Sequence, residues 1–145
     1  MRELPRKLTT DELAELFESR TRLVERLAGI EDPLSRADEV VASLAEEEKV
    51  EALDAHPAIG ARKLSSRSAT EQGADADPAV LAELSYLNQV YEEKFGFRFV
   101  VFVDRRAKRE ILEVLRERIE RPREEELDTG CRELVAIARD RWIRT

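Results

Sequence analysis

Residues 77–103 read DPAVLAELSYLNQVYEEKFGFRFVVFV, and this stretch carries the clearest structural signals in the chain. Asp77 and Pro78 mark a helix start, because the aspartate can cap free amides and proline fits the first helical position. Apolar residues then recur at helical spacing as far as Phe95, and Gly96 is typical of a helix end. The stretch therefore predicts a long helix followed by an extended run.

The run after this helix, residues 97–103, is rich in phenylalanine and valine and has high strand propensity. No second comparable run exists in the sequence to pair with it in a sheet. We therefore expect a lone, buried extended segment. Such a stretch is most simply core, but its unpaired backbone amides could also hydrogen-bond a polar ligand, as an oxyanion hole does.

Helical signals also precede this stretch. Thr9 and Glu12 form a capping box at the start of an amphipathic helix whose apolar residues continue to Leu27. Asp32 and Pro33 repeat the pairing of an N-cap carboxylate with proline, which predicts the start of a second helix.

Three further helices are predicted from local spacing. Residues 46–53 form the first, which should end near Ala55 because Pro57 disfavours helical geometry at the residue before it. Apolar positions predict another over residues 111–119 and a last one over residues 127–142.

Size and composition agree with one helical domain. The chain has 145 residues, of which 39% are charged and 42% apolar, with 5 Gly and 5 Pro. We predict an all-α fold over residues 1–145, a single-domain helical bundle of about seven to nine helices with one short extended segment near Phe97 to Val103.

The composition argues against several function classes. A formal net charge of −7 gives nucleic acid no overall electrostatic attraction. One cysteine, Cys131, and one histidine provide no set of soft ligands, so we expect no metal site. No stretch is apolar for long enough to span a membrane, and neither end carries a recognisable targeting signal, so we expect a cytoplasmic protein.

The only histidine, His56, precedes Pro57 where a helix is predicted to end. Proline holds its predecessor in an extended conformation, which can present the imidazole at a cavity wall. Histidine titrates near neutrality, so His56 could transfer a proton at physiological pH, although a lone histidine in a loop is more often not catalytic.

Residues 68–72, with the sequence Ser-Ala-Thr-Glu-Gln, are a second candidate because they place a hydroxyl, a carboxylate and an amide within one turn. Ser68 and Glu71 also fit a capping box that touches no ligand. The residues that follow supply no apolar stripe for a helix to bury, so both interpretations stay open.

Three motifs occur in order: His-Pro-x-Ile-Gly at residues 56–60, Ser-x-x-Glu-Gln at 68–72, and Leu-Asn-x-x-Tyr-x-x-x-Phe-Gly-Phe-x-Phe-Val at 87–100. With this order and spacing the chain resembles the 2-oxo-4-hydroxy-4-carboxy-5-ureidoimidazoline (OHCU) decarboxylase family over nearly its whole length. Residues 16–19 and 108–112 are also similar to the family. The resemblance implies an all-α homodimer that converts OHCU to (S)-allantoin in urate degradation, a branch of purine catabolism.

The resemblance also implies roles for residues. His56 matches the family's catalytic histidine, the proton donor, and Glu71 matches the carboxylate that holds and polarises the substrate. The substrate-binding residues that it implies are Pro57, Ser68, Ala69, Thr70, Gln72, Phe99, Val100, Val101, Phe102 and Val103. It implies no metal and no cofactor, because a ring C=N next to the departing carboxylate can take up the electron pair.

The chain departs from the family pattern just after the extended run. Asp104 stands where animal-type members carry an arginine, and Arg105 and Arg106 follow it. Either of these arginines could anchor the substrate's carboxylate, or the substrate could differ. Two other functions therefore stay open: a non-catalytic ureide-binding or regulatory relative, and a helical interaction protein in which every motif serves capping or core packing.

Overall fold

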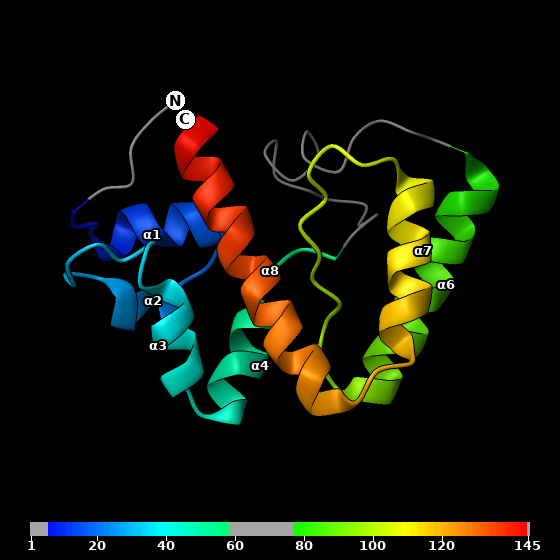
Figure 1. Ribbon diagram of the computed structural model, residues 1–145, viewed down its shortest axis with the longest axis horizontal. Coiled ribbons are helices and arrows are strands. Elements are labelled where there is room, and N and C mark those ends of the chain that lie inside the picture. Colours follow the sequence, from blue (N-terminus) through cyan, green and yellow to red (C-terminus); the bar gives the residue numbers. More distant parts are fainter. Residues whose placement is uncertain (1–5, 59–76, 145) are drawn as a thin grey trace.

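The computed structural model describes residues 6–58 and 77–144, and these residues form seven α-helices and no strand (Figure 1). In chain order the helices are α1 (Thr10–Phe17), α2 (Arg22–Leu27), α3 (Ala37–Ser43), α4 (Glu46–Asp54), α6 (Pro78–Phe95), α7 (Lys108–Ile119) and α8 (Arg123–Arg144). The predicted all-α class is confirmed. Over the same two ranges, no helix combines the length and apolar character that a membrane span requires.

The long helix α8 runs through the middle of the molecule, with α1 to α4 on one side and the α6–α7 pair on the other (Figure 1). It contacts α1, α3 and α4, and α6 packs against α7. Residues 97–103, called the extended segment below, lie between α7 and α8. The carbonyl of Val100 accepts a hydrogen bond from Arg118 of α7 at 2.8 Å, and the N–H of Phe102 donates to Glu133 of α8 at 3.4 Å.

The extended segment is part of the core, as the sequence predicts. Phe102 is half-buried, and the other apolar side chains of the segment are buried: Phe97, Phe99, Val100, Val101 and Val103. The described residues contain no strand that could pair with the segment, and side chains donate instead to the carbonyls of Val100 and Phe102. The prediction of a lone buried extended segment is confirmed.

Local capping signals located several helix ends correctly. The side chain of Asp77 accepts a hydrogen bond from the N–H of Ala79 at 3.0 Å and caps α6, which ends at Gly96 in a left-handed conformation with φ +81°. Helix α4 ends at Asp54, and Ala55 is its C-cap residue. These three boundaries were visible in the sequence because each depends on residues next to it.

The predicted first helix is wrong in its length. Its capping box is present, since the Thr9 N–H donates to Glu12 and the Glu12 N–H donates to the Thr9 hydroxyl, both at 3.1 Å. Helix α1 nevertheless ends at Phe17, because Glu18 takes a left-handed conformation with φ 58°. Thr21 then caps a separate helix, α2.

The predicted start of the next helix at Asp32 and Pro33 is also wrong. Asp32 has φ 51°, whereas an N-cap residue has an extended backbone. A turn follows, in which the N–H of Arg36 donates to the carbonyl of Asp32 at 3.0 Å. Helix α3 therefore begins only at Ala37.

A buried ion pair joins α7 to α8. The side chain of Arg118 is 3% exposed and that of Glu126 is 0% exposed, and Nε donates to Oε1 at 2.7 Å. The hydroxyl of Tyr91, on α6, donates to the same oxygen at 2.7 Å, and its burial together with that carboxylate raises the tyrosine pKa. Since Arg118 also donates to the carbonyl of Val100, this cluster joins three helices to the extended segment.

Candidate active site

His56 lies just after α4 and is held in place by its backbone. Its N–H donates to the carbonyl of Leu53 at 3.1 Å, and the whole residue is 7% exposed. The Nδ1 atom is buried and has no hydrogen-bond partner within residues 6–58 and 77–144. A buried polar atom without a partner is rare in folded proteins because it costs free energy, and a catalytic role is one explanation for such an atom.

Three charged side chains act on His56. Arg141, on α8, is buried, and its Nη2 lies 3.5 Å from Oε2 of Glu18, the C-cap residue of α1. Burial of the imidazole, followed by the positive charge of Arg141, lowers the pKa of His56 from 6.5 to about 4; Glu18 opposes this shift and Arg98 adds to it. The imidazole is therefore neutral at neutral pH.

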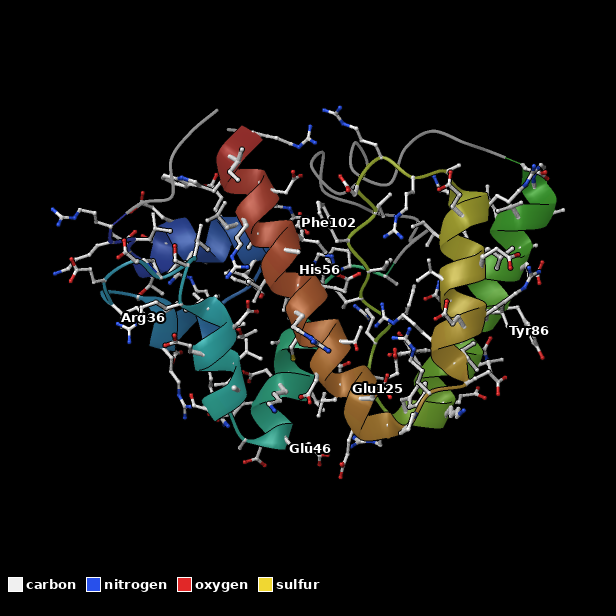
Figure 2. All side chains as sticks on the ribbon, viewed as in Figure 1. Arg36, Glu46, His56, Tyr86, Phe102 and Glu125 are labelled. Carbon is white, nitrogen blue, oxygen red and sulfur yellow. The ribbon has the colours of Figure 1, made fainter. Side chains whose placement is uncertain are left out.

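The extended segment also contacts the histidine loop. Arg98 donates from Nη1 to the carbonyl of His56 at 2.6 Å, which ties the segment to the histidine loop. Figure 2 shows His56 and Phe102 in the middle of the molecule, close to α8. Phe102 also donates its N–H to Glu133 of α8, and Arg141 of the same helix acts on His56, so α8 supplies a charged residue to the segment and another to the histidine.

The three charged residues directly after the segment have different environments. Asp104 and Arg105 are exposed and take left-handed conformations with φ 48° and 62°. Arg106 folds back on the segment, where Nη2 donates to the carbonyl of Phe102 at 2.5 Å and Nε to that of Val103 at 3.0 Å. Arg105 and Arg106 were the two candidates for binding the substrate's carboxylate. Of these, Arg106 donates to backbone carbonyls and Arg105 faces solvent.

Only part of the predicted site can be compared with the structure. His56, the half-buried Pro57 and the extended segment lie within the described residues. The other predicted residues, Ser68, Ala69, Thr70, Glu71 and Gln72, lie outside them. The pairing of His56 with Glu71 therefore stays a prediction.

Sequence reasoning missed Arg141 and Glu18, although the sequence contains a signal for the arginine. Arg141 lies three residues after Ala138 and seven after Leu134, on the apolar stripe of the last helix. A charged residue in a core position needs a buried partner or a function, and Arg141 has Glu18 on one side and the carbonyl of Leu16, at 2.7 Å, as a further acceptor.

Comparison with known proteins places this chain in a family. The sequence profile described as OHCU decarboxylase matches residues 2–142. The chain belongs to the OHCU decarboxylase family. It is 29% identical over 143 residues to the uric acid degradation bifunctional protein PucL of Bacillus subtilis, a match that covers 91% of this chain and 29% of that protein. The chain thus spans less than a third of PucL.

Other members of the OHCU decarboxylase family are nearer to this chain in size. An OHCU decarboxylase of Halalkalicoccus jeotgali is 29% identical over 120 residues, which cover 74% of this chain and 68% of that protein. A crystal structure of OHCU decarboxylase in the presence of (S)-allantoin superposes with a TM-score of 0.78 and 25% identity, over 92% of this chain and 96% of that one. The fold is shared over nearly the whole of both chains.

The titration of His56 tests this description of the candidate site. Because the chain has one histidine, its ring protons can be followed by NMR without assignment ambiguity. We expect a midpoint near pH 4 in the folded protein. A midpoint near 6.5 would show that the imidazole is exposed to water and free of the arginine charges.

The lowered pKa of His56 also predicts how the stability of the fold depends on pH: stability should fall as the pH falls. The pKa in the folded state lies below the unfolded value of 6.5, so between about pH 4 and 6.5 the unfolded chain binds the extra proton. The contribution of His56 to stability is therefore complete above about pH 6.5 and is lost as the pH falls toward 4. In urea unfolding, wild type should lose stability relative to His56→Gln as the pH falls from about 6.5 toward 4, because the variant lacks this proton uptake.

Proposed function

We propose that this chain is a carboxy-lyase that decarboxylates OHCU to (S)-allantoin in the degradation of urate. The observation that carries the proposal is a neutral, buried imidazole whose Nδ1 has no partner within the described residues and whose pKa is lowered by the buried cation Arg141, in a chain of the OHCU decarboxylase family. Relatives named for uric acid degradation support the pathway.

The chemistry of the substrate explains why so few groups suffice. The carboxylate of OHCU is attached to a ring carbon that carries a hydroxyl and lies next to a ring C=N. When the bond to the carboxylate breaks, CO2 leaves and the electron pair moves into the C=N, whose nitrogen takes up a proton. The resulting enol then loses its hydroxyl proton and gains a proton on the neighbouring carbon. This sequence needs no other electron acceptor, so no cofactor is proposed.

The protein's task is to bind the substrate and to move protons. The neutral His56 can accept the hydroxyl proton and return it to the neighbouring carbon, which gives it the donor role proposed from the family. Delivery to one face of that carbon would fix the handedness of allantoin. Arg141 supplies a positive charge for the anionic substrate, and Glu71 is proposed to hold and polarise it.

The remaining contacts are proposed from the family resemblance. Backbone amides of the extended segment, at Phe99, Val100, Val101, Phe102 and Val103, would hydrogen-bond the substrate's polar atoms. The other proposed contact residues are Pro57, Ser68, Ala69, Thr70 and Gln72.

A non-catalytic ureide-binding or regulatory relative is the second candidate. It is favoured by Asp104, which is exposed in the turn directly after the extended segment, at the position where animal-type members of the family carry an arginine. Such a protein would bind allantoin without accelerating decarboxylation.

One experiment separates the two candidates. Freshly generated OHCU is mixed with the purified chain, its loss is followed by ultraviolet absorbance against buffer, and (S)-allantoin is titrated calorimetrically in parallel. A rate that rises in proportion to protein concentration supports the decarboxylase. Binding of allantoin without any acceleration supports the regulatory relative. If the chain neither binds allantoin nor accelerates the reaction, both candidates are contradicted.

Three further properties are proposed from the sequence and the family resemblance: a single domain over residues 1–145, a homodimer, and a cytoplasmic location. For the homodimer, light scattering of the purified chain should give about twice its mass of 16.7 kDa.

A further inference from the structure

Two parts of the chain that are far apart in sequence meet at Arg98. The histidine loop follows α4, whereas the extended segment follows α6. The N–H of Arg98 donates to Oδ1 of Asp54 at 2.9 Å, and its Nη1 donates to the carbonyls of Asp54 at 3.0 Å and His56 at 2.6 Å. The last carbonyls of a helix have no partner within the helix, so this side chain supplies donors at the point where α4 ends.

The guanidinium of Arg98 is itself oriented. Its Nε donates to Oε1 of Glu92, on α6, at 3.2 Å. The Arg98 side chain is 32% exposed, so these ion-pair and hydrogen-bond contacts contribute little to global stability. A planar guanidinium presents several donors in fixed directions, which a lysine ammonium does not. The contacts therefore define geometry more than they add free energy.

We propose that Arg98 is a positioning residue that fixes the backbone of His56 against the extended segment. Through it, the imidazole and the amides of the segment would face the same substrate molecule. This inference rests on the proposed decarboxylase function. It assigns Arg98 no contact with the substrate, and its effect on the reaction passes through His56.

Two substitutions separate the geometry of Arg98 from its charge. The charged groups that act on His56 are Arg141 of α8, Glu18 at the end of α1, and Arg98 itself. Arg98→Met removes both the donors and the charge, whereas Arg98→Lys keeps the charge and loses the planar fork. Arg116→Met is the matched control, because Arg116 is an exposed arginine that also pairs with two glutamates, on α6 and α7.

Steady-state kinetics with OHCU and NMR titration of His56 are measured for all three variants. We expect both Arg98 variants to lower kcat about tenfold or more while KM changes little, because small misplacement of a catalytic group is costly. Arg98→Met should also raise the pKa of His56, and Arg98→Lys should leave it nearer to the wild-type value. Arg116→Met should change neither. If both Arg98 variants keep kcat within about twofold of wild type, the proposal is overturned.

A second measurement keeps the inference separate from the proposed function. If wild type does not decarboxylate OHCU, the function fails but amide hydrogen exchange still tests the positioning role. The His56 amide should then exchange faster in both Arg98 variants than in wild type and in the control. Unchanged exchange in variants that remain folded would overturn the inference without reference to activity. Arg98→Lys, the more conservative change, carries the test if Arg98→Met does not fold.

Discussion

Replacing His56 with alanine should lower kcat for OHCU decarboxylation by about 10²- to 10⁴-fold, the usual contribution of a positioned acid–base group. His56 is the only histidine in the chain, and burial beside Arg141 keeps its imidazole neutral and able to accept a proton. The substitution removes the group that would take the hydroxyl proton and return it to carbon. Initial rates of OHCU loss, compared at saturating substrate, measure the effect.

His56→Gln is the matched control for loss of packing. Glutamine fills similar space and can hydrogen-bond, but it does not transfer protons near neutral pH. The glutamine variant should unfold at a temperature closer to wild type than His56→Ala does, because alanine leaves a cavity at this buried position, and both variants should be similarly inactive. A glutamine variant with nearly full activity would mean that His56 only binds the substrate and that another group moves the proton.

The second large effect concerns stability. Replacing Glu126 with alanine should lower the free energy of unfolding by about 3 to 5 kcal/mol, because it leaves the charge of Arg118 buried without its partner. It also removes the acceptor at 2.7 Å for the buried hydroxyl of Tyr91. Urea denaturation followed by circular dichroism measures the change.

A double variant, Arg118→Met with Glu126→Met, tests the cause. Replacing both members of a buried ion pair with apolar side chains is often neutral or stabilising, so this variant should be much more stable than Glu126→Ala alone. Neither Nη2 of Arg118 nor Oε2 of Glu126 has a hydrogen-bond partner in the described parts of the chain, which makes the native pair an imperfect one. A loss of less than about 1 kcal/mol in Glu126→Ala would contradict this account of the cluster.

Elements whose ends depend on neighbouring residues could be predicted from the sequence. Helix α6 has its N-cap in Asp77 and its C-cap in Gly96, and both were recognised. The extended segment was also predictable, since its composition favours a strand and nothing in the sequence could pair with it. Burial of its apolar side chains between α7 and α8 follows from the same composition.

Predictions failed where distant residues set the local backbone. The break between α1 and α2 occurs at Glu18, a non-glycine residue in a left-handed conformation, and its side chain lies 3.5 Å from Arg141 near the end of the chain. Local spacing gives no information about such a partner. The same holds for Asp32, whose N–H donates to the carbonyl of Arg6 at 2.6 Å and whose positive φ prevents it from capping α3.

For the candidate site, the motif residues were predictable but their supporting charges were not. His56 and the extended segment were identified from type, order and spacing. Arg98 and Arg141 were missed because an arginine's partner is chosen by the tertiary fold, and Arg98 donates to carbonyls that belong to another helix end. Arg118 and Arg141 are buried, and each occupies a helix position where the spacing predicts an apolar residue. A charged residue at such a position indicates a buried partner or a function.

The handedness of the product tests the central claim most directly. Decarboxylation in water protonates both faces of the planar intermediate and gives racemic allantoin, whereas an enzyme that delivers the proton to one face gives one enantiomer. The circular dichroism of fresh OHCU is recorded over time with and without the wild-type chain. We predict a signal of (S)-allantoin that grows at a rate proportional to protein concentration and is lost in His56→Ala. A reaction that proceeds at the buffer rate and leaves no dichroic product would contradict the assignment.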